Sequence, residues 1–226
     1  MEDKLNGNLK ECEVDIPKLT KMKALAFSAL YFISIEVFSQ NFLMPVDCVY
    51  IVIGRGTMAT GVIERGIINT GDAVEIVGMG ARNLTSTITG VEMSQRLGNR
   101  GEPGDTVGLL LRQIDTTEIK RGMVICKPGS VTVHSKLKAQ VHFLSKKEGG
   151  NNAPFSNRYL LKFHFRNINI SGEIKLPTGV ELVTPGENVS LEIQLIDKVA
   201  MERGLRFVIR DGGRTVGSGE IKETLD

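Results

Sequence analysis

The sequence has few cysteines and histidines, and this scarcity limits its chemistry. Its three cysteines, Cys12, Cys48 and Cys126, are odd in number and lack the spacing of a metal site or a disulfide framework. This usage favours a reducing, cytoplasmic environment. His134 and His142 stand singly, which is typical of surface or barrel-wall residues rather than of ligands. We therefore predict no metal site.

A large excess of charge of one sign is also missing. The chain carries 28 basic and 26 acidic residues, a net charge of +2. The net charge therefore neither indicates nor excludes a nucleic acid partner, and any such binding would need a local basic surface.

The sequence has no apolar run long enough to span a membrane. The longest candidate, residues 24–35, is uncharged and ends before Glu36. As a helix it would measure about 18 Å, against roughly 30 Å for the hydrocarbon core of a bilayer. We predict an apolar helix in a cytoplasmic protein. The alternative is a signal peptide that starts at Met22 and is cleaved after Val37-Phe38-Ser39, which would export the remainder.

A phosphate-binding loop is missing as well. The stretch IGRGTMATG, residues 53–61, has the glycine spacing of a nucleotide site, but the residues after it read as a strand rather than the helix such a site needs. No Gly-Lys-Ser or Gly-Lys-Thr occurs in the chain. We therefore predict a glycine turn between two strands, and no bound nucleotide cofactor.

After about residue 41 the sequence consists of short apolar or alternating runs separated by glycine and proline turns. Eight runs are predicted to be strands: CVYIVI, AVEIVG, TVGLLLRQI, MVICK, KAQVHFL, YLLKFHFR, VSLEIQLI and LRFVIR. No helical pattern exceeds two turns. The predicted fold class is all-β, built as barrels or sandwiches.

An internal repeat divides this region in two. Residues 103–122 align without gaps onto residues 185–204, with eight of twenty positions identical. Each copy has a Pro-Gly turn, a strand, a loop and then Arg-Gly before another strand. Turns recruit the same residues in many proteins, so shared turn chemistry explains part of the match. We nevertheless predict two similar β-domains joined near residues 127–131.

Several long stretches carry a family resemblance: FLMPVDCVYIVIGRGTMATGVIERGIINTGDAVEIVG, TSTITGVEM, KRGMVICKPGS, LSKKEGG, ELVTPGENV and GLRFVIRDGGRTVGSG. They closely resemble the second and third domains of bacterial elongation factor Tu, over roughly residues 42–226. The resemblance implies two consecutive antiparallel β-barrels, residues 42–129 and 130–226. Residues 1–41 then form an extension with none of the motifs of the family's GTPase domain. No enzyme activity is implied, and GTP and Mg²⁺ would enter only with a separate GTPase domain.

The resemblance also implies partners and contact residues. The partners would be aminoacyl-tRNA, the ribosome and elongation factor Ts. In the first barrel a pocket for the tRNA 3′ end would involve the hairpin turn and a carboxylate that can accept a hydrogen bond from a ribose hydroxyl. In the second, basic strand faces would contact the RNA backbone. The implied tRNA-binding residues are Arg55, Gly56, Thr57, Glu92, Arg121, Ser171, Arg210, Asp211 and Gly212.

The sequence departs from the family at several positions around these sites. They are Ser94-Gln95, Thr106, Asn151-Asn152-Ala153 and the Leu160-Leu161-Lys162 that follows Tyr159. Losing two hydrogen bonds to charged groups weakens binding roughly 10²–10⁴-fold. We therefore predict a translation-factor fragment that binds tRNA weakly. The alternatives are partnership with a separately encoded GTPase domain, a non-translational and exported interaction protein, and an inactive gene remnant.

Overall fold

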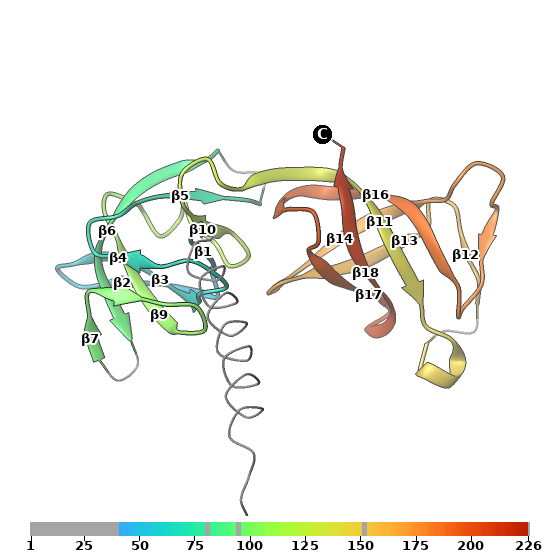
Figure 1. Ribbon diagram of the computed structural model, residues 1–226, viewed down its shortest axis with the longest axis horizontal. Coiled ribbons are helices and arrows are strands. Elements are labelled where there is room, and N and C mark those ends of the chain that lie inside the picture. Colours follow the sequence, from blue (N-terminus) through green and yellow to red (C-terminus); the bar gives the residue numbers. More distant parts are fainter. Residues whose placement is uncertain (1–40, 80–81, 94–95, 151–152, 226) are drawn as a thin grey trace, which may run out of the picture. The chain divides into compact units, whose positions relative to one another are not determined.

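The computed structural model describes residues 41–79, 82–93, 96–150 and 153–225, with the side chains of residues 96 and 97 excepted. The predicted N-terminal helix and the alternative signal peptide lie outside these residues, as do the departures at 94–95 and 151–152. Gln40–Asp226 form one compact unit, and it is built almost entirely from strands (Figure 1). The predicted all-β class is confirmed for the described residues.

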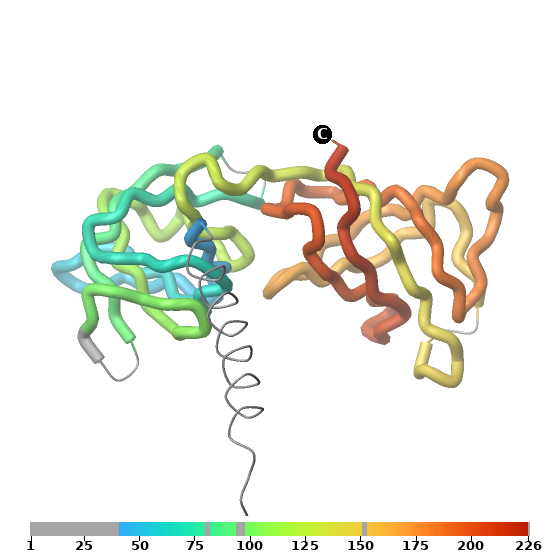
Figure 2. Tube along the Cα trace, in the orientation of Figure 1, coloured from blue at the N-terminus to red at the C-terminus, as the bar shows by residue number. Residues whose placement is uncertain are grey.

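Figure 2 shows the chain completing one sheet before it enters a second. The first half contains β1 (Leu43–Pro45), β2 (Cys48–Val52), β3 (Gly56–Val62), β4 (Ile68–Asn69), β5 (Ala73–Val77), β6 (Leu84–Met93), β7 (Arg96–Gly98), β8 (Arg100–Gly101), β9 (Thr106–Leu111) and β10 (Val124–Cys126). The second half contains β11 (Thr132–Phe143), the 3₁₀ turn η1 (Lys146–Glu148), β12 (Phe155–Ser156), β13 (Leu160–Phe165), β14 (Ile168–Lys175), β15 (Leu182–Val183), β16 (Asn188–Met201), β17 (Arg206–Asp211) and β18 (Arg214–Thr224).

The first half is a curved antiparallel sheet in the order β1-β10-β5-β6-β9-β3-β2, with β7 beside β6. A single bridge between Leu43 and Arg65 brings β1 close to the chain that leaves β3, where Leu43 N donates to Arg65 O over 3.0 Å. The predicted first barrel is therefore found only in part, as a half-barrel sheet. Besides this bridge, the segment that contains the three-residue β1 is linked to β3 and the residues after it by hydrogen bonds from Glu64 N to Leu43 O and from Asp47 N to Thr60 O, over 2.9 and 2.8 Å.

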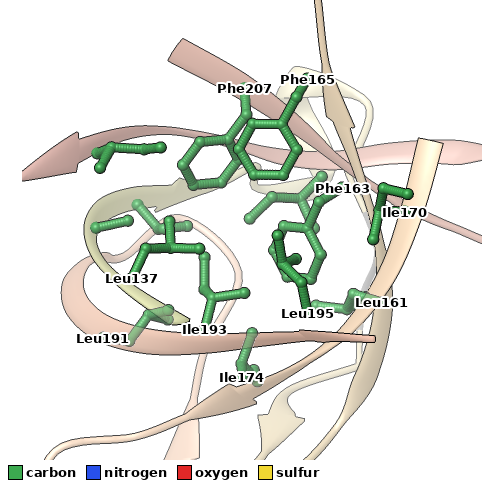
Figure 3. Packing of buried hydrophobic residues seen from close by; sticks show 14 of the residues in the cluster. Leu137, Leu161, Phe163, Phe165, Ile170, Ile174, Leu191, Ile193, Leu195 and Phe207 are labelled. Carbon is green, nitrogen blue, oxygen red and sulfur yellow. The ribbon is translucent and has the colours of Figure 1, made fainter. Parts of the chain in front are cut away.

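The second half is a closed barrel in the order β11-β16-β14-β13-β17-β18, with β18 pairing back onto β11. The predicted barrel is confirmed here. Along β13 the side chains alternate as the sequence indicates, because Leu161, Phe163 and Phe165 are buried while Lys162 is exposed. Figure 3 shows the inward side chains packed together. The ring centroids of Phe163 and Phe207 are 5.9 Å apart, and those of Phe165 and Phe207 are 5.1 Å apart.

The internal repeat recurs in the backbone. Gly104 and Gly186, which follow the two prolines, have φ values of 91° and 99°. Gly122 and Gly204, at the two Arg-Gly steps, have φ values of 92° and 88°. Glycine adopts this left-handed conformation without steric cost. The repeat therefore encodes two pairs of matching turns.

Ion pairs join the half-barrel sheet to the barrel. Arg166, in the turn between β13 and β14, has a side chain only 7% exposed. Its Nε donates to Glu64 over 2.9 Å, and its Nη1 donates to the carbonyl of Ala200 over 2.7 Å. Arg65 forms a two-point ion pair with Glu202, with one bond of 2.8 Å. Strand alternation along YLLKFHFR predicts that Arg166 shares the face of Lys162 and His164, and this is wrong, because the hairpin turn directs its guanidinium into this joint.

Close packing completes the joint. The Asn167 amide donates to the carbonyl of Val46 over 2.7 Å. A Cβ added at Gly122 would lie 1.8 Å from Cγ2 of Ile168, so the backbone at residue 122 packs directly against that side chain. A small buried cluster also takes members from both halves: Leu43, Val77, Val124, Cys126, Val131 and Ala200. The joint therefore combines a buried apolar cluster with partly exposed ion pairs.

Candidate nucleic-acid interface

The glycine stretch forms the hairpin between β2 and β3. Arg55 N donates to the carbonyl of Val52 over 2.9 Å, and Gly54 and Gly56 have φ values of 74° and 108°. The strand β3 begins directly at Gly56, so no helix N-terminus is available for a phosphate. The prediction of a turn between strands is confirmed.

This hairpin places Arg55 against Glu92 of β6. The guanidinium Nη1 donates to the carboxylate, and the two side chains are 50% and 29% exposed. Two glycines lie beside them, and each packs against an apolar side chain. An added Cβ at Gly90 would be 3.0 Å from Leu110 and 3.5 Å from Nη2 of Arg55, and Gly108 is the cross-strand partner of Glu92. The result is a platform with both an acceptor and a donor at its edge.

Thr57 lies on the other face of β3. It is only 5% exposed, and its hydroxyl donates to the carbonyl of Ile114 over 2.6 Å. The neighbouring Met58 lies on the platform side, since an added Cβ at Gly108 would be 2.7 Å from its sulfur. The structure therefore brings Arg55, Gly56 and Glu92 together and separates Thr57, whose hydroxyl holds the loop that follows β9.

Arg121 is exposed at the joint between the two halves. Its Nε donates to the carbonyl of Asn167 over 3.2 Å, which orients the guanidinium across the turn between β13 and β14. Arg121 is thus placed apart from the Arg55–Glu92 pair, and its predicted role at a tRNA phosphate stays a prediction.

On the barrel, register brings two of the predicted residues into one row. Lys162 of β13 pairs with Ser171 of β14 on one side and with Arg210 of β17 on the other. We call these three residues the Lys162 row. Cβ atoms directly opposite each other on neighbouring strands are about 4.5–5.5 Å apart, so the row presents two cations and a hydroxyl side by side. Lys162 and Arg210 make no ion pair with the part of the chain that the structure describes.

The end of the row is fixed by the hairpin between β17 and β18. Gly212 and Gly213 have φ values of 52° and 86°, and Arg210 Nη2 donates to the carbonyl of Gly213 over 2.7 Å. The hydroxyl of Tyr159 donates to Asp211 over 3.2 Å, and this hydrogen bond raises the pKa of Tyr159. Tyr159 positions Asp211, and no sequence pattern predicts this contact, because only the fold brings the two residues together.

Other kinds of site are not found among the described residues. They contain no group of three or more His, Cys, Asp or Glu side chains that could hold a metal ion. They also contain no helix whose length and apolar character would let it cross a bilayer. The candidate binding surfaces are therefore the Arg55–Glu92 platform and the outer face of the barrel.

Comparison with known families identifies both halves. Residues 56–126 match the model of elongation factor Tu domain 2, and residues 130–225 match that of the elongation factor Tu C-terminal domain. The chain belongs to the elongation factor Tu family. The matched models are those of the family's non-catalytic β-domains, and the resemblance found in the sequence is confirmed. The elongation factor Tu domains meet at the Arg166 joint, and each carries one of the two polar surfaces.

Proposed function

We propose that residues 42–226 form an RNA-binding module of translation elongation that takes the aminoacylated end of tRNA on the Arg55–Glu92 platform. The observation that supports this most directly is the pairing of Arg55 with Glu92 beside two glycines, within a matched elongation factor Tu domain 2. Glu92 accepts from a ribose hydroxyl, which DNA lacks at the 2′ position.

The ion pair suits a site that must open for a ligand. An exposed pair of this kind contributes only about 0–1 kcal/mol to stability, so exchanging it for ligand contacts costs little. Arg55 also offsets the charge of Glu92, which would otherwise repel the RNA backbone. The Lys162 row then contacts phosphates, the sequence-independent part of RNA affinity. The module needs no cofactor of its own for this, and GTP with Mg²⁺ would come with a separate GTPase domain.

The test compares charged and uncharged tRNA in filter binding at several salt concentrations. Charged tRNA is expected to bind more tightly, and Glu92→Gln is expected to weaken it about tenfold, since a hydrogen bond to a charged group is worth about 1.5–3 kcal/mol. Glu223→Gln, a distant barrel variant that keeps Glu92, is the matched control. Equal, purely salt-dependent binding of both tRNAs would refute the proposal and favour the non-translational interaction protein.

A further inference from the structure

The strand β2 leaves one of its two edges open. It is the terminal strand of the half-barrel sheet and pairs with β3 on one side. Ile51 is 72% exposed, and Ile53, which follows the strand directly, is 95% exposed. On the open side, the backbone N–H and C=O groups of β2 have no strand partner among the described residues, and apolar side chains stand beside them.

The other sheet edges are closed, covered or short in the part of the chain that the structure describes. The barrel is closed, since β18 pairs back onto β11. At the far end of the half-barrel sheet, β1 has the chain around Arg65 beside it, where Glu64 N donates to the carbonyl of Leu43 over 2.9 Å. The strands β4, β7, β8, β12 and β15 have two or three residues each, against five in β2. A molecule with one long open edge can form a closed pair with a second copy, because a two-fold contact uses the same edge of both.

The charge distribution along this edge suits a second copy. Residues 48–53, CVYIVI, contain no charged side chain. The nearest charges are Asp47 before the segment, which is partly exposed, and Arg55 after it, which is exposed. In an antiparallel pair the start of one strand lies beside the end of the other. Two copies of β2 therefore meet without a charge in the contact, and each Arg55 comes near Asp47 of the second copy.

The side chains favour one register of this pairing. With a two-fold axis at Ile51, that residue lies opposite its own copy, Tyr50 lies opposite Val52, and Val49 lies opposite Ile53. Residues directly opposite each other in an antiparallel pair share a face of the sheet and pack together. This register therefore covers the two most exposed residues of the edge, Ile51 and Ile53, with β-branched side chains.

Moving the axis by one residue in either direction sets a charged residue opposite an apolar one. An axis at Tyr50 places Ile53 against Asp47. An axis one residue after Ile51 places Val49 against Arg55. Both alternatives bring a charge next to an apolar side chain, which disfavours them relative to the axis at Ile51.

We propose that two copies of this chain pair edge to edge through antiparallel β2 strands, about a two-fold axis at Ile51, and form a weak dimer. The proposal does not depend on RNA binding. A contact made by one pair of strands lies at the low end of interface size, below about 1,200 Å², which is typical of transient complexes. The dimer should therefore form between micromolar and millimolar concentration.

The test uses cysteines as reporters of the register, in the full chain with Cys12→Ser and Cys48→Ser. Cys126 can remain, because it is buried and burial raises its pKa to about 11. Ile51→Cys places two thiols on the axis, where opposite Cα atoms are about 4.5–5.5 Å apart, within the roughly 4.4–6.8 Å found for disulfides. Under mild oxidation this variant should form a covalent dimer.

Tyr50→Cys is the matched control for the register. Its two thiols would be two residues out of line across the contact, with Cα atoms more than about 7 Å apart, too far for a disulfide. Ile196→Cys, at a 67% exposed position of the barrel, measures cross-linking by random collision. Ile51→Cys should cross-link about tenfold faster than either control, because only its thiols are held at bonding distance.

Sedimentation equilibrium of the unmodified chain completes the test, and circular dichroism checks that each variant is folded. The mean mass should rise toward that of a dimer and no further. A chain that stays monomeric up to millimolar concentration, or one that grows beyond a dimer without limit, overturns the proposal. Cross-linking of Ile51→Cys no faster than that of Tyr50→Cys or Ile196→Cys overturns it as well, because the pairing about Ile51 is then absent.

Discussion

Arg55, Glu92 and Thr57 lie on two different faces of the first sheet, and only one of these faces is open to a ligand. Arg55 and Glu92 meet on the outside of the sheet, while Thr57, two residues after Arg55, turns inward. From the sequence alone, all three residues are assigned to one site, because Arg55 and Thr57 are close along the chain and all three match one pocket of the family. It could not separate them, since the face of Thr57 depends on where the strand β3 begins after a three-residue turn.

A substitution at Thr57 tests whether its hydroxyl group stabilises the fold. Thr57→Val keeps the shape but removes the 2.6 Å hydrogen bond to Ile114. The carbonyl of Ile114 then lacks this donor, so the free energy of unfolding should fall by about 1–3 kcal/mol. Urea denaturation measures the change. Thr60→Val, which loses only an exposed 3.4 Å contact to Cys48, should change stability by less than about 0.5 kcal/mol. Equal effects of the two variants would contradict this assignment.

Among the strands, β2 has the least protection. It is the last strand of the half-barrel sheet and has no charged residue, yet Ile51 is 72% exposed and the following Ile53 is 95% exposed. Natural edge strands usually carry lysine, proline or a bulge, which block pairing with another chain. An uncharged, β-branched edge of this length is a template for association between molecules.

We therefore expect the protein to associate as its concentration rises, and Ile51→Lys to suppress this by placing a charge on the edge. Static light scattering between micromolar and millimolar concentration measures the mean mass. Ile196→Lys is the control, because Ile196 is 67% exposed but belongs to the closed barrel. Suppression by both variants alike would show that general surface charge, rather than the β2 edge, is responsible.

The strands themselves were largely predictable, and their closure was not. Alternation fixed the inward face of β13, and Pro-Gly and Arg-Gly steps located the turns. Whether a sheet closes depends on the pairing of its terminal strands, which are β1 and β2 in the half-barrel sheet and β11 and β18 in the barrel. On its other side from β10, β1 makes one bridge, between Leu43 and Arg65, and no local sequence pattern predicts this. The direction of the Arg166 side chain was also not predictable, because the alternation of a strand ends where the hairpin turn begins.

At the scale of the whole compact unit, the joint decides whether the two halves unfold together. Arg166 is nearly buried and contacts Glu64, Glu202 and the carbonyl of Ala200. Removing Arg166 takes this partner from Glu64, while Glu202 keeps its ion pair with Arg65, so the cost should lie below the about 3–5 kcal/mol of a fully buried pair. The half-barrel sheet and the barrel have separate hydrophobic cores, so each can stay folded after the contacts of the joint are lost.

Arg166→Ala should therefore lower stability and divide a single unfolding transition into two. Differential scanning calorimetry resolves this, by comparing the calorimetric with the van't Hoff enthalpy. Lys175→Ala, an exposed lysine in the same barrel, should leave one transition with its midpoint nearly unchanged. A single cooperative transition for Arg166→Ala would show that the apolar cluster alone couples the halves.

The contact of Gly122 with Ile168 has a consequence for how this protein can vary. Because a Cβ at residue 122 would lie 1.8 Å from Cγ2 of Ile168, residue 122 can gain a side chain only where residue 168 is smaller. A gain of volume at 122 requires both a smaller residue at 168 and a backbone free of the left-handed conformation. A graft that exchanged one half for a relative's would therefore have to match the residue at 168 to the one at 122.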